Sequence, residues 1–144
     1  MHKLVDWPGY VVGRGEDVLD SGACGPCTAI AIVDPEYRSA VVGHFVHPPC
    51  EEEVLDEMLK AARAAIPDFV EAMVQVAGAS PDLALAWSEK SETNRVRQFV
   101  QRKLAEAGLS ARNITQSWND SIDHGQFIVV DLGLRKLDLE TFEI

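Results

Sequence analysis

The chain has 144 residues, of which 47% are hydrophobic, a size and composition that predict one globular domain, residues 1–144, with a real core. It carries 13 basic and 23 acidic residues, a net charge of −10 that argues against binding nucleic acid through its phosphates. No apolar run is long enough for a membrane-spanning helix, and the N-terminus lacks an apolar signal-peptide core, so we expect a cytoplasmic protein without membrane insertion.

A β-hairpin is predicted in the first third of the chain. Val18-Leu19 is short and apolar enough for a strand, and the β-branched segment Thr28–Val33 alternates as a strand does. Asp34-Pro35 predicts a turn, because proline suits its second position. Ser39–Phe45 then predicts the returning strand, which Pro48-Pro49 ends.

Two helices and further strands follow. Apolar residues at helical spacing predict a helix from Glu51 to Pro67, and a second helix from about Glu92 to Ala107. Alternating residues predict strands at 69–76, 113–118, 126–131 and 136–142. This order favours an α+β fold, a single domain in which a mixed β-sheet sandwich has its two main helices packed outside.

The chemistry-bearing residues gather around the predicted hairpin. Cys27 lies just before its first strand and His44 near the end of its second, so the turn brings the two toward each other. A thiol beside an imidazole is the arrangement of a cysteine nucleophile with its general base. Ser21, a short distance upstream, can accept from or donate to His44 and fix its ring. An equally simple interpretation makes Ser21 a local turn hydroxyl.

Around these residues the chain resembles the chemoreceptor glutamine deamidases (CheD). Gly25-Pro26-Cys27, Val33-Asp34-Pro35 and Gly43-His44-Phe45 with Pro48 stand where that family has Gly-Ser-Cys, an Asp-Pro turn and a histidine segment, and the spacing from cysteine to histidine is similar. Ser21 stands in place of the family's threonine. The resemblance spans roughly residues 10–140 and is tightest from Cys27 to Pro48.

The resemblance implies an enzyme on the fold shared with the cytotoxic necrotizing factor deamidases. Cys27 is expected to attack the carboxamide of a protein glutamine, His44 to move the proton, and water to hydrolyse the thioester. Ser21 completes the expected catalytic set, with no cofactor. Chemoreceptors are the implied substrate and a CheC-type phosphatase a possible partner.

Besides Ser21 and the loop from Asn119 to Gly125, other features depart from the family pattern. Pro26 replaces the serine before the nucleophile and has no N–H to offer an oxyanion. Cys24 stands where an apolar residue is expected, and Ala77-Gly78-Ala79 replaces Gly-Gly-Ala. An altered substrate or a lost activity is therefore open, which leaves a non-catalytic binding module on the same fold as one alternative.

The cysteines also allow two other chemistries. Cys24-Gly25-Pro26-Cys27 matches the dithiol of thioredoxins, which predicts a thiol-disulfide oxidoreductase or a regulatory disulfide. That enzyme needs its second cysteine to enter a helix, whereas strand-like residues follow Cys27 here. The second is zinc binding, because the spacing of five residues is typical of zinc ligands. The candidate ligands are Cys24, Cys27, His44, His47 and Cys50.

Overall fold

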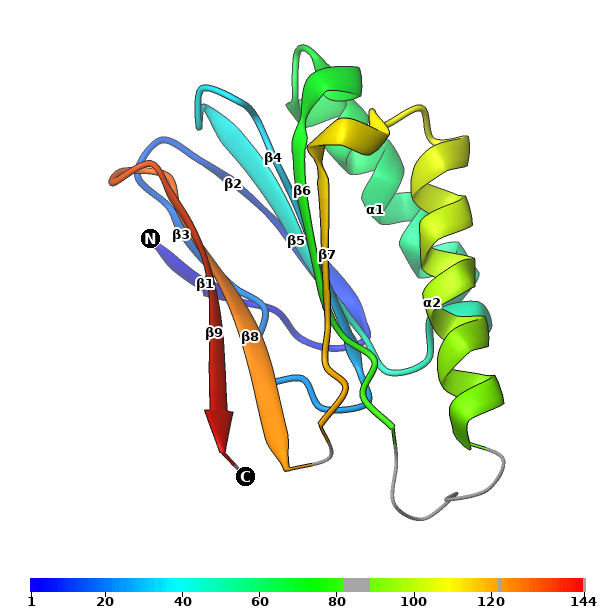
Figure 1. Cartoon of the computed structure of the whole chain (residues 1–144). Coiled ribbons are helices and arrows are strands. Elements are labelled where there is room, and N and C mark those ends of the chain that lie inside the picture. The colour runs from blue at the N-terminus through cyan, green and yellow to red at the C-terminus, as the bar shows by residue number, and fades with distance from the viewer. Residues whose placement is uncertain (82–88, 122, 144) are drawn as a thin grey trace.

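The computed structural model describes residues 1–81, 89–121 and 123–143, with the side chains of 89–91 left out. Two β-sheets stack face to face, and two helices cover the outer side of the larger sheet (Figure 1). This is the predicted α+β sandwich with its helices outside. No helix in the described ranges is both long and apolar enough to cross a membrane.

The smaller sheet has the strand order β1-β3-β8-β9. Its strands are β1 (His2–Leu4), β3 (Val18–Asp20), β8 (His124–Asp131) and β9 (Lys136–Glu143). The larger sheet has the order β2-β5-β4-β6-β7. Its strands are β2 (Gly9–Arg14), β5 (Ser39–Phe45), β4 (Thr28–Val33), β6 (Met73–Gly78) and β7 (Ile114–Trp118). Both sheets are mixed, since β1–β3 and β6–β7 are parallel pairs.

The helices are α1 (Glu52–Ala65) and α2 (Glu89–Glu106), with short 3-10 turns at η1 (Pro48–Glu51), η2 (Phe69–Glu71) and η4 (Ala111–Asn113). One predicted strand starts too early: residues 69–71 form η2, and β6 begins only at Met73 and runs to Gly78. Alternation alone cannot separate a single 3-10 turn from the strand that follows it.

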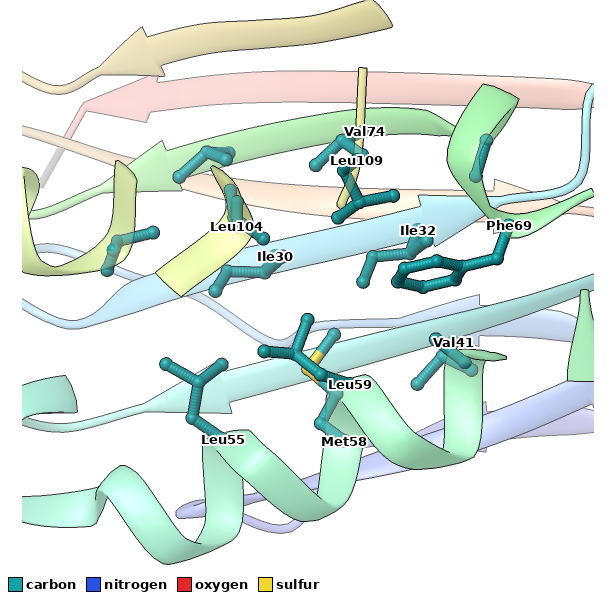
Figure 2. Packing of buried hydrophobic residues seen from close by; sticks show 14 of the residues in the cluster. Ile30, Ile32, Val41, Leu55, Met58, Leu59, Phe69, Val74, Leu104 and Leu109 are labelled. Carbon is teal, nitrogen blue, oxygen red and sulfur yellow. The ribbon is translucent and has the colours of Figure 1, made fainter. Parts of the chain in front are cut away.

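Two apolar layers hold the fold together. The outer layer lies between the larger sheet and the helices, where Leu55 and Met58 of α1 and Leu104 of α2 meet Ile30 and Ile32 of β4 (Figure 2). The inner layer lies between the two sheets. Since successive side chains of a strand point to opposite faces, β4 and β5 are buried on both sides and contribute to both layers.

The β4–β5 hairpin is set by its turn. Asp34 is fully buried, and one of its carboxylate oxygens accepts the backbone N–H groups of Glu36 and Arg38. The Arg38 guanidinium binds both oxygens at 2.8 and 2.9 Å and lowers the pKa of Asp34. This turn fixes the register in which Ala29 lies opposite His44. His44 and the residues just before β4 are thereby brought to one end of the inner layer.

Candidate functional site

His44 lies at the end of the inner apolar layer and is almost fully buried, with 2% of its surface exposed. Its Nδ1 is 2.7 Å from the backbone carbonyl oxygen of Ser21. A carbonyl only accepts hydrogen bonds, so Nδ1 carries the proton and Nε2 presents a lone pair. Burial lowers the pKa of His44, an effect that the Ser21 carbonyl and the charge of Glu51 partly oppose. The ring is therefore neutral at pH 7, as a general base must be.

The sulfur that contacts this ring belongs to Cys24. Cys24 Sγ lies 3.6 Å from His44 Nε2, and we call these two side chains the buried pair. The sequence predicted Cys27 in this place, but no hydrogen bond joins Cys27 to His44, although both lie in the described part of the chain. Cys24 is 1% exposed, and burial together with the nearby Cys27 strongly raises the pKa of its thiol.

The backbone of the loop before β4 explains why Cys24, and not Cys27, contacts His44. Cys24 forms an isolated β-bridge with Gln126 of β8, with N–O distances of 2.6 and 2.8 Å in the two directions. The Gln126 side chain then accepts the N–H of Gly78 at the end of β6. These contacts fasten the loop between the two sheets and direct the Cys24 side chain inward, onto the imidazole.

Cys27 is half-buried and packs against the edge of the inner layer. It lies two residues before Ala29, the partner of His44, so both side chains belong to the same face of the hairpin. Burial and the charge of Glu51 raise the pKa of the Cys27 thiol, while its own backbone N–H lowers it. Of the two cysteines, Cys27 is the less buried residue.

The Ser21 hydroxyl does not touch His44. It donates to the carbonyl of Gly22 and accepts the N–H of Ile128 on β8, at 2.8 and 2.9 Å. The predicted link from Ser21 to the histidine exists, but it runs through the main-chain carbonyl.

Three further residues shape the site and were not predicted as part of it. Trp7 stacks on the His44 ring with centroids 5.7 Å apart, and it is itself 60% exposed. The charge of Glu51 acts on the Cys27 thiol, and the Gly78 backbone packs closely against the Cys27 backbone. A Cβ at Gly78, whose φ is +87°, would lie 2.1 Å from the Cys27 carbonyl oxygen. Of these three residues, only Gly78 was noted in the sequence in the comparison with the family pattern, as part of the Ala77-Gly78-Ala79 segment.

The five candidate zinc ligands do not converge. Cys24 pairs with His44, while His47 Nδ1 lies 3.1 Å from Cys50 Sγ at the surface. Within residues 1–81, 89–121 and 123–143, no group of three or more His, Cys, Asp and Glu side chains is arranged to hold a metal ion. The residue after Cys27 opens β4 rather than a helix, so the thioredoxin geometry is also missing, and all three cysteines are free thiols.

No protein-family model matches this chain, and no curated protein sequence matches it. What the site does must therefore be argued from its own residues.

Proposed function

We propose that the protein is a cysteine amidohydrolase that deamidates glutamine side chains of a protein substrate, with Cys27 as nucleophile and His44 as base. The observation that carries the proposal is the orientation of His44. Its Nδ1 is fixed by the Ser21 carbonyl, so the bare Nε2 faces the thiol region. The CheD-like resemblance of Cys27–Pro48 makes chemoreceptor glutamines the proposed substrate and a CheC-type phosphatase a proposed partner.

The assignment of the nucleophile to Cys27 rests on access. A glutamine on another protein cannot reach the Cys24 sulfur, which is 1% exposed, whereas Cys27 lies at the half-buried rim of the same layer. The proposed mechanism requires the Cys27 side chain to rotate so that its sulfur approaches His44 Nε2. When no substrate is present, the Cys24 sulfur contacts His44 Nε2.

The reaction follows from these groups. His44 Nε2 takes the Cys27 proton as the sulfur attacks the carboxamide carbon, and the imidazolium returns the proton to departing ammonia. Water then hydrolyses the thioester and leaves glutamate. Pro26 offers no N–H, so the amide of Cys27 itself, which already stabilises its own thiolate, is the proposed oxyanion donor.

The test is ammonia release from glutamine-containing peptides of chemoreceptors, with mass spectrometry to locate the new glutamate. Cys27→Ser and His44→Ala are each expected to reduce the rate by about a hundredfold or more. Cys24→Ala is the matched control: it removes the sulfur that contacts His44 and should retain or increase the rate. Loss of activity in Cys24→Ala with retention in Cys27→Ser would reverse the assignment, and no release by the wild type would refute the activity.

A further inference from the structure

A second thiol–imidazole contact lies at the surface, three residues beyond the first histidine. Cys50 is exposed, and its Sγ lies 3.1 Å from His47 Nδ1. The other ring nitrogen, Nε2, lies 2.7 Å from Oε1 of Glu92 on α2. We call Cys50, His47 and Glu92 the surface triad.

The hydrogen bonds of the surface triad have one consistent direction. A carboxylate only accepts, so His47 Nε2 donates to Glu92 and Nδ1 is left to accept the proton of the Cys50 thiol. Transfer of that proton to Nδ1 creates an imidazolium that the Glu92 carboxylate stabilises. The backbone keeps the geometry in place, because Cys50 N–H donates to the His47 carbonyl and His47 N–H donates to the Glu51 side chain.

The surface beside the triad indicates which reagents reach it. A groove of about 380 Å³ begins at Pro49, next to Cys50, and is lined by Arg95, Gln98, Phe99 and Arg102 of α2. Two arginines line this groove, and each is also held by a carboxylate of α2: Arg95 lies 3.2 Å from Glu92 and Arg102 lies 3.6 Å from Glu106. A guanidinium has five N–H donors, so the donors that Glu92 and Glu106 do not use can bind a carboxylate of a small molecule in the groove.

We propose that Cys50 is a thiol-modification site that exchanges with small disulfides bearing carboxylate groups, with His47 as its base and Glu92 as a positioning residue. Cys50 Sγ gives its proton to His47 Nδ1 and attacks one sulfur of the disulfide. A new S–S bond forms to Cys50 as the bond within the reagent breaks. The released thiolate takes the proton back from His47, so one thiol is consumed and one is formed.

The experiment uses the full reduced chain and glutathione disulfide, with peptide mass spectrometry to follow the mixed disulfide at each cysteine over time. Cys50 is expected to react at least about tenfold faster than Cys27, and His47→Ala to remove at least about tenfold of its rate. Imidazole added to the buffer should restore part of the rate in His47→Ala, which a merely structural role for His47 does not predict. His2→Ala, which removes an imidazole elsewhere on the surface, is the matched control and should react as the wild type does.

Two further variants test the other parts of the proposal. Glu92→Gln should slow Cys50 about threefold or more, because an amide stabilises the imidazolium less well. Arg95→Gln combined with Arg102→Gln should slow the reaction with glutathione disulfide but not with uncharged hydroxyethyl disulfide. An unchanged Cys50 rate in His47→Ala overturns the proposal of an activated thiol, and equal slowing with both disulfides overturns the anionic specificity.

Discussion

Two cysteine–histidine contacts lie within one short stretch of chain, and they differ in almost every physical respect. In the buried pair, the imidazole is fixed by a main-chain carbonyl and both side chains are sealed between two sheets. In the surface triad, the imidazole is fixed by a carboxylate and the thiol is exposed. The same two residue types thus meet in opposite environments.

The two environments differ in how strongly they disfavour the charged forms of the thiol and the imidazole. Burial disfavours both the thiolate and the imidazolium, so the buried pair is held as a neutral thiol and a neutral base. A neutral base suits proton transfer that is delayed until a substrate arrives. In the surface triad the ring contacts a carboxylate, with His47 Nε2 2.7 Å from Glu92 Oε1, and the thiol is exposed. The comparison separates a thiol and an imidazole that burial keeps neutral from a thiol and an imidazole that are open to solvent and to a carboxylate.

The largest expected effect on stability comes from Gly78→Ala, which disturbs the backbone that holds the buried pair. The new Cβ would lie 2.1 Å from the Cys27 carbonyl oxygen and 3.2 Å from Cys24 Cβ, at a φ of +87°. We expect a loss of roughly 3 kcal/mol in the free energy of unfolding, measured by urea denaturation. Gly15→Ala is the matched control, since Gly15 has a φ of +62° with nothing within 4 Å, and it should cost only about 1 kcal/mol.

A similar cost for the two glycine variants would show that the loop before β4 yields easily to the added methyl group. The Cys50 modification rate of folded Gly78→Ala should equal that of the wild type, because the surface triad does not depend on this loop.

The next effect compares the two histidines directly. His44→Ala leaves the Ser21 carbonyl unpaired in a buried place and opens a cavity beneath Trp7, so we expect a loss of about 2 kcal/mol. His47→Ala removes a half-exposed ring and an exposed ion pair, which should change stability by about 0.5 kcal/mol or less. Thermal and urea unfolding of both variants measure the contrast. Equal losses would mean that the buried pair contributes no more to folding than a surface contact does.

The fold was largely predictable because its signals are local. Alternation in Thr28–Val33, the Asp34-Pro35 turn and the returning segment Ser39–Phe45 predicted the central hairpin correctly. β1 and β2 were missed, because the first has three residues and the second, an edge strand containing Gly9 and Gly13, is defined by its pairing with β5. Such pairing depends on distant residues that a local pattern does not contain.

The site was predictable in outline but not in its contacts. Spacing placed a cysteine near His44, yet the choice of Cys24 depends on its bridge to Gln126, which lies about a hundred residues away in the chain. The link from His47 to Glu92 likewise joins a turn to a separate helix, and no pattern in the sequence indicated that Glu92 belongs to a site. Sequence patterns identified the cysteine and histidine side chains, and tertiary packing decided which of them meet.

The smallest effect is a dependence of stability on pH. The folded pKa of His44 is below the usual value of about 6.5 for an unfolded chain, so the unfolded state binds more protons as the pH falls through this region. Stability due to His44 is therefore complete above about pH 7 and declines on acidification through the window between the two pKa values. Urea titrations between about pH 8 and pH 5.5 keep the carboxylates ionised. In His44→Asn the slope should flatten in this window, because the only change is the loss of the group that folds as a neutral ring. A slope equal to that of the wild type would mean that His44 takes up a proton as readily between the sheets as in water. Burial would then not disfavour the imidazolium in the buried pair.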